Sequence, residues 1–281
     1  MPTRSLDEEA IDRSKTTTNW TGFLLVVLAS FLWSLSGFFT QLPELNVWPP
    51  ETRGIPIAFW RAVFALTLLL PLVRRVSWDL RMIPMTLCFV AMNLSFLTAI
   101  VVGSPANAIW LQYLAPGWVM LGAIWIYGDQ TNARDWFMLG FCIAGVLFIL
   151  VMESLHSTPI PGHRWWAPWL AVLSGICYSG VILSIRSLPR ADPAWLIALN
   201  HLVTALVFLP FVLVMNSALP SGRLWLILAG LGIFQMGLPY FIFAHGLKST
   251  PSHIAALITL LEPILLPLWV HLTRRGDSTY S

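Results

Sequence analysis

One carboxylate lies deep within an apolar stretch near the end of the chain. Glu262 follows the residues IAALITLL and precedes PILLPLW. A charge in such a stretch is costly unless it is paired or protonated, and ionisable groups inside membrane segments are functional by default. Glu262 is therefore a candidate for proton coupling or for binding the amino group of a ligand. The alternatives are a hydrogen bond between helices and a neutral carboxylic acid beside Pro263.

Helical spacing places Glu262 on a narrow polar face. Residues three or four apart share one side of a helix, so this face is formed by Ser252, Ala255, Thr259 and Glu262. An earlier segment repeats the pattern with Pro105, Ala108, Gln112 and Ala115. We expect the two faces to line one central cavity, with Thr259 and Gln112 as binding candidates.

Arg61 is the cation inside a predicted membrane segment. Its guanidinium is suited to a carboxylate in bidentate geometry. The competing interpretations are snorkelling to the headgroups and pairing with Glu44 or Glu51. The matching residue in the second half of the chain is Asn200, so the fold itself does not demand a charge here.

Aromatic side chains divide by depth. Tryptophans at segment ends fit an interfacial belt, whereas the candidates for a binding pocket lie within segments: Trp33, Trp110, Tyr113, Tyr178 and Tyr240. Packing is the competing role for each. His201 and His245 also lie within segments, as a proton relay or as hydrogen-bonding groups between helices. The histidine and cysteine spacings predict no metal site.

The composition is that of an integral membrane protein. Hydrophobic residues make up 57% of the chain and charged residues 10%, and the mean hydropathy is +0.74. The apolar stretches have the length of membrane-spanning helices and do not alternate as barrel strands do. We predict an all-α protein with about nine transmembrane helices, at residues 20–40, 55–73, 82–102, 106–127, 136–152, 165–186, 193–214, 224–247 and 253–272.

The second group of helices repeats the first. AFWRAVFALTLLLPL, at residues 58–72, aligns with IALNHLVTALVFLPF at 197–211, and SPANAIWLQYLAP aligns with TPSHIAALITLLEP. Five helices per half is an odd number, so the halves must be inverted repeats, a build typical of transporters. The predicted parts are a polar cytoplasmic tail (1–19), a five-helix repeat (20–152), a connecting loop (153–164), an incomplete four-helix repeat (165–273) and a polar tail (274–281).

Positive charge in the loops predicts a cytoplasmic N-terminus. With that orientation ten basic residues lie inside and five outside: Arg4, Arg13, Lys15, Arg74, Arg75, Arg81, Arg134, Arg186, Arg190 and Lys248, against Arg53, Arg164, Arg223, Arg274 and Arg275.

The segments FLWSLSGFF, FWRAVFA, YLAP and LPYFIFAHGLKSTPSHIAALITLLEPILLPLW resemble the EamA-like family of the drug/metabolite transporter superfamily, over about residues 20–272. The resemblance implies a ten-helix carrier of two inverted repeats that exports amino acids, other metabolites or toxic compounds. Two departures are the absence of a tenth helix and Gly128–Asp129 in place of the more usual Gly-Glu.

The functional prediction is a secondary transporter that exports small metabolites such as amino acids. It would work by alternating access in the inner (plasma) membrane. No GxxxxGK[ST], HExxH or GxSxG sequence is present, so we expect neither direct use of ATP nor an enzyme, and no cofactor. The alternative is a truncated, non-transporting remnant of such a carrier. Expected partners are a small-molecule substrate and the lipid bilayer, without nucleic acid; a homodimer is a further expectation.

Overall fold

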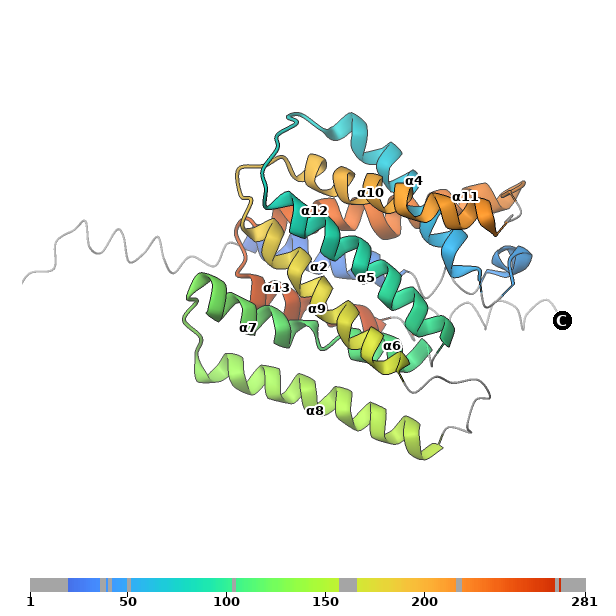
Figure 1. The fold of residues 1–281 in the computed structure, drawn as a ribbon. Helices are drawn as coiled ribbons and strands as arrows, with labels where there is room; N and C mark the ends of the chain where they lie inside the picture. Colours follow the sequence, from blue (N-terminus) through green and yellow to red (C-terminus); the bar gives the residue numbers. More distant parts are fainter. Residues whose placement is uncertain are drawn as a thin grey trace, which may run out of the picture.

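The structure is a computed structural model that describes residues 20–35, 42–49, 52–102, 105–156, 166–215 and 219–265, with Phe39 and Leu268. In this part of the chain all regular elements are helical (Figure 1). They are α2 (Trp20–Ser34), η1 (Pro43–Val47), α4 (Gly54–Leu69), η2 (Leu70–Leu72), α5 (Met82–Val102), α6 (Pro105–Gln112), α7 (Ala115–Tyr127), α8 (Ala133–His156), α9 (Ala167–Arg186), α10 (Pro193–Val214), α11 (Arg223–Gly230), η3 (Leu231–Gly237), α12 (Leu238–Gly246) and α13 (Ser252–Ile258).

The predicted segments agree with these helices at most of their ends. The third and seventh segments, α5 and α10, have the predicted bounds. The fifth is longer than predicted, because α8 begins at Ala133 and continues to His156, into the predicted connecting loop. Apolarity marks where the hydrocarbon core ends, whereas a helix continues as long as its backbone bonds are satisfied. The two predicted polar tails lie outside the described residues.

Six helical stretches are long and apolar enough to cross a membrane, namely Gly54–Leu72, Met82–Ile100, Ala108–Tyr127, Ala167–Arg186, Pro193–Val214 and Arg223–Gly246. Two shorter apolar helices are Trp20–Ser34 and Ser252–Leu265. The exposed surfaces of the helices in the described structure, including α8, carry large apolar side chains such as Leu24, Phe141, Leu206 and Leu226. An apolar outer surface on an all-helical bundle is what a bilayer requires.

Two of the segments are broken at matching places. The fourth is interrupted at Tyr113 and Leu114, between α6 and α7, just before Pro116. The ninth is interrupted at Thr259 and Leu260, just before Pro263, and resumes at residues 261–265. Proline cannot donate the backbone hydrogen bond of a helix interior, which accounts for a break just before each of these two prolines.

Helix contacts follow the pattern of a twofold axis between the halves. The third helix of each half packs against the first helix of the other, as α5 with α9 and α12 with α2. The two second helices pack on each other, as α4 with α10, and so do the two broken helices, as α7 with α13. Equivalent helices of the two repeats thus make equivalent contacts, as a twofold axis requires. Each repeat packs its first and third helices against the other repeat, so the two repeats are interlocked.

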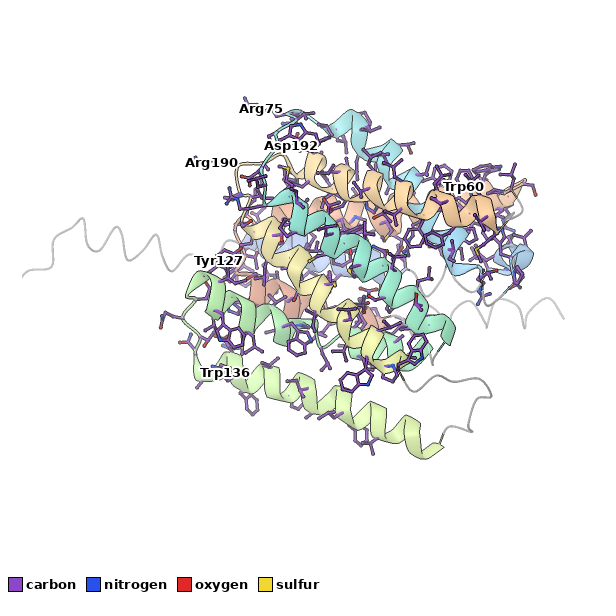
Figure 2. The ribbon with its side chains drawn as sticks, in the orientation of Figure 1. Trp60, Arg75, Tyr127, Trp136, Arg190 and Asp192 are labelled. Carbon is purple, nitrogen blue, oxygen red and sulfur yellow. The ribbon has the colours of Figure 1, made fainter. Side chains whose placement is uncertain are left out.

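The opposed directions of the repeats follow from which ends meet. We use "loop end" for the end of the bundle that carries the connections at residues 73–81, 128–132, 187–192 and 247–251. Figure 2 shows Arg75, Asp192, Arg190 and Tyr127 gathered there, far from Trp60. Helix α2 begins at the loop end, because Gly22 lies against Gly246 and Thr250. Its repeat equivalent, α9, ends there at Arg186. The predicted inversion is therefore present.

Candidate functional site

An aromatic group lies in the core where α2, α5, α9 and α12 meet. It consists of Trp33, Phe89, Tyr178, Tyr240 and Phe243, all nearly fully buried. The ring centroid of Trp33 is 4.9 Å from that of Tyr240 and 6.5 Å from that of Tyr178, with edge-to-face geometry. Phe89 contacts Tyr240 at 5.2 Å. Each half of the protein therefore contributes rings to one group, which includes three of the predicted pocket residues.

Glu262 joins this group from the broken ninth helix. Its carboxylate lies beside the hydroxyl of Tyr113, at the break between α6 and α7. Thr259, one turn earlier, interacts with the hydroxyl of Tyr178. Both helix breaks thus place a polar residue at the edge of the aromatic group. Broken helices with this placement are the form in which transporters build sites at mid-membrane.

Arg61 projects from α4 into the protein interior. Its Nη1 donates to Oε1 of Gln235, in the π-helical turn η3, over 3.4 Å, and its Nε is buried without a hydrogen-bond partner in the described residues. The hydrogen bond to Gln235, which is itself buried, favours a position of the guanidinium inside the protein over snorkelling. The pairing alternative with Glu44 is wrong, because Glu44 pairs with Arg223 at 3.1 Å. Glu51 lies outside the described residues.

Asn200 and His201 are the least satisfied side chains of the interior. Both residues are 0% exposed, and neither the amide atoms of Asn200 nor the two ring nitrogens of His201 have a hydrogen-bond partner in the described part of the protein. The His201 ring contacts Phe89 at 5.1 Å and Tyr240 at 6.1 Å. An unsatisfied buried polar group costs about 1–3 kcal/mol, so this arrangement is expensive for the folded state.

Gln112 takes a different place from the other candidates. It ends α6, and its backbone packs on α9, where a Cβ on Gly175 would lie 2.9 Å from the Gln112 carbonyl oxygen. Glycine permits this close approach of two helices. The structure therefore gives Gln112 a packing contact through its backbone, whereas Arg61, Tyr113, Thr259 and Glu262 bring side chains to the interior.

The loop end holds a second polar cluster. Arg186 binds Asp129 in bidentate geometry, with Nη1 to Oδ2 at 2.6 Å and Nη2 to Oδ1 at 2.7 Å. The same guanidinium donates to Ser252 Oγ at 3.0 Å and lies 4.5 Å above the ring of Tyr127. Through these contacts α7 of the first half is joined to α9 and α13 of the second. The hydrogen bonds from Arg186 hold the pKa of Asp129 below its ordinary value.

Asp192 ties two further loops together at this end. It caps α10 through the amide of Ala194, and it accepts the amides of Arg74 and Arg75 at 2.5 and 3.0 Å. Partial burial acts to raise the pKa of Asp192, but these amide hydrogen bonds outweigh it, and the pKa is lowered. The loop end is thus closed by contacts that cross between the repeats.

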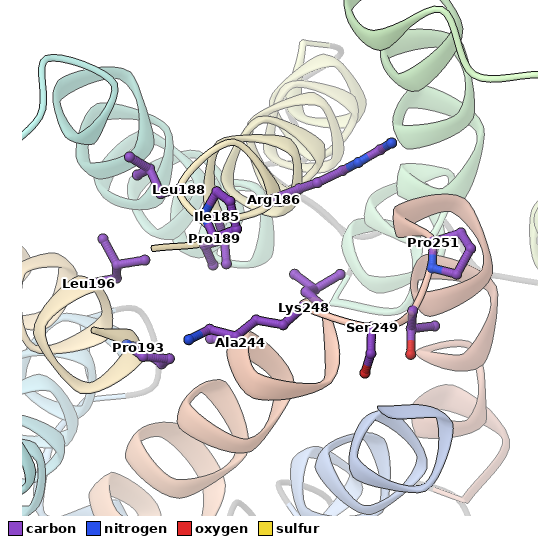
Figure 3. A pocket seen from close by; sticks show the side chains of 12 residues that line it. Ile185, Arg186, Leu188, Pro189, Pro193, Leu196, Ala244, Lys248, Ser249 and Pro251 are labelled. Atoms are coloured by element: carbon purple, nitrogen blue, oxygen red, sulfur yellow. The ribbon is translucent and has the colours of Figure 1, made fainter. Parts of the chain in front are cut away.

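A half-open pocket of about 370 Å³ lies between the α9–α10 turn and the end of α12 (Figure 3). Lys248 extends across it, whereas Arg186 points away toward α7. Most of the other lining is apolar, from residues such as Leu188, Leu196 and Leu247. Among the described residues, no three His, Cys, Asp or Glu side chains gather as metal ligands would.

Gln235 and Phe89 were missed by the reasoning from sequence, and Asn200 and His201 were weighed there without being chosen. Gln235 is a lone polar residue in an apolar segment, and that was the available signal. Phe89 resembles any other core phenylalanine. Its importance depends on the neighbours His201 and Tyr240, which are more than a hundred residues away in the chain.

Comparisons with known proteins agree with this architecture. An uncharacterized transporter of Archaeoglobus fulgidus is 23% identical over 171 residues, which are 60% of this chain and 58% of that protein, so the match spans little more than half of the relative. A solved crystal structure, described only as that of a protein, shares the fold with a TM-score of 0.73 at 18% identity, over 90% of this chain and 88% of the other.

The EamA-like transporter family matches twice, over residues 20–151 and 165–275. The two matches correspond to the two inverted halves and together cover most of the chain. This multi-pass membrane protein belongs to the EamA-like transporter family.

Proposed function

We propose that this protein is a secondary carrier that exports small metabolites such as amino acids by alternating access. It would lie in the inner (plasma) membrane with its N-terminus in the cytoplasm, and it would act as a carrier rather than an enzyme. The basic residues that favour this orientation include Arg74, Arg75, Arg81 and Lys248, all at the loop end.

The observation that carries the substrate class is the pair of opposite charges at one buried group of rings. Arg61 and Glu262 act on each other and on Tyr240 electrostatically, yet in the described structure no ion pair joins them. Arg61 binds Gln235, and Glu262 lies beside Tyr113. Two charges kept apart in a low-dielectric interior suit a ligand that carries both charges itself, with Arg61 for a carboxylate and Glu262 for an ammonium group.

Alternating access is supported by the interlocked inverted repeats and by the matched breaks before Pro116 and Pro263. A break in a helix allows the segments on its two sides to move relative to each other while each segment keeps its packing contacts. Opening the loop end would require the contacts of Asp129 and Asp192 to release, because both join elements of different halves.

Uptake of labelled amino acids into proteoliposomes, with and without a pH gradient, tests the proposal. We expect gradient-dependent uptake that Glu262→Gln reduces by about tenfold or more, since one charge-assisted contact is worth that much. Glu44→Gln is the matched control, because Glu44 pairs with Arg223 away from the aromatic group, and it should retain uptake. Wild-type protein without uptake across a broad panel would refute the carrier function and favour the non-transporting remnant.

A further inference from the structure

Two polar residues on α10, Asn200 and His201, lie opposite the helix that carries Arg61, and the proposed charge pair leaves both unused. Arg61 and Asn200 occupy equivalent positions in the two repeats, on helices α4 and α10, which pack on each other. His201 follows Asn200 and lies close enough to Arg61 to be affected by its charge. A guanidinium, a carboxamide and an imidazole are thus carried by the second helices of the two repeats, which pack on each other.

These groups share an uncommon property. Nε of Arg61, both amide atoms of Asn200 and both ring nitrogens of His201 are buried and have no hydrogen-bond partner in the described residues. Buried polar atoms in native proteins are nearly always paired, and several unpaired ones on two helices that pack together call for an explanation. By contrast, Nδ1 of His245, also in a membrane segment, contacts the carbonyl oxygen of Phe241 at 2.9 Å.

The donors among the unpaired atoms favour an anionic ligand group. Arginine offers only donors, the asparagine amide offers two N–H groups, and a neutral imidazole offers one. With the charge of Arg61 among them, these donors match the oxygen atoms of a carboxylate. The rings of Phe89 and Tyr240 flank His201 and exclude water from one side of it.

We infer that Asn200 and His201, together with Arg61, form the subsite for the carboxylate of the transported molecule. This inference rests on the proposed carrier function and adds the residues that select the anionic group. Asn200 and His201 are 0% exposed, so the subsite is closed in this conformation and is reached when the halves move. The unpaired side chains of Asn200 and His201 lower the stability of the folded protein, and they are retained because they bind the ligand.

A trade-off between stability and binding distinguishes this role from a structural one. Asn200→Leu and His201→Leu replace unpaired polar groups by apolar ones of similar size. Both variants should therefore unfold at a higher temperature than wild type in detergent. A side chain that stabilises the bundle would give the opposite shift. His245→Leu is the matched control, which removes a histidine that has a partner, and it should not raise the unfolding temperature.

Binding is measured by the shift of the unfolding temperature with free amino acids, the corresponding amino-acid amides and the corresponding amines without a carboxyl group. The wild type should be stabilised only by probes with a free carboxylate. Both leucine variants should weaken the apparent affinity by roughly tenfold or more, while His245→Leu should leave it unchanged.

Three results would overturn the inference: a lower unfolding temperature in both leucine variants, equal stabilisation of the wild type by amides and acids, or no carboxylate-dependent shift across the panel. None of these unfolding measurements depends on whether the protein transports the ligand. A carboxylate-dependent shift in a protein that transports nothing would therefore leave the subsite standing while the carrier function fails.

Discussion

Asp129→Asn removes the negative charge from the contact that joins α7 to α9 and α13. The wild-type carboxylate accepts two short hydrogen bonds from Arg186, and the two side chains are only 17% and 27% exposed. Exposed ion pairs contribute about 0–1 kcal/mol, and breaking a fully buried pair costs about 3–5 kcal/mol. For this partly buried bidentate pair we expect a loss of about 2 kcal/mol in the free energy of unfolding.

The assay is denaturant or thermal unfolding of the purified protein in detergent for Asp129→Asn, Arg186→Gln and the double variant. Arg186→Gln should cost more than Asp129→Asn, because it also loses the contacts with Ser252 and Tyr127. The double variant should cost less than the sum, with a coupling of about 1–2 kcal/mol.

Asp79→Asn is the matched control. Asp79 also forms an ion pair at the loop end, at 2.6 Å with Arg81, but both residues belong to one connection and are more exposed. Its loss should destabilise the protein far less than the loss of Asp129, because solvent screens exposed ion pairs. Additive effects at Asp129 and Arg186, or an equal loss at Asp79, would refute the view that the contact between repeats holds the loop end together.

Two further predictions concern pH and helix packing. The folded state lowers the pKa of Asp129 and Asp192, so their stabilisation is present above the ordinary carboxyl pKa of about 4 and is lost as the pH falls through the lowered values. Unfolding temperatures measured between neutral and strongly acidic pH should drop at the acid end, and less steeply in Asp129→Asn; an equal slope would contradict this. Gly175→Ala should destabilise the protein by about 1–3 kcal/mol, because its Cβ would lie 2.9 Å from a backbone oxygen. Gly140→Ala is the control and should not destabilise the protein, because nothing lies within 4 Å of its Cβ. Thermal unfolding followed by circular dichroism compares the two variants, and equal losses of stability would exclude the close approach of the helices as the cause.

The all-helical membrane fold was determined by the sequence itself. Runs of apolar residues define membrane helices because a bilayer offers no partners to an exposed backbone, and this local rule gave the bounds of α5 and α10. The repeat was visible because both halves keep proline and small polar residues at matching positions, as at Pro116 and Pro263. Inversion followed from the odd number of helices in one half.

The partners of individual side chains were decided only by the tertiary structure. Periodicity tells which face of a helix a residue occupies, but not which helix packs there. The sequence therefore left three interpretations of Arg61 open, and only the structure shows that its guanidinium contacts Gln235, 174 residues away in the chain. The same holds for Asn200 and His201, whose buried atoms are unpaired only because of what α4, α5 and α12 place around them. Hydropathy is a property of each segment, whereas hydrogen-bond satisfaction depends on all segments together, and for that reason it could not be predicted from the chain alone.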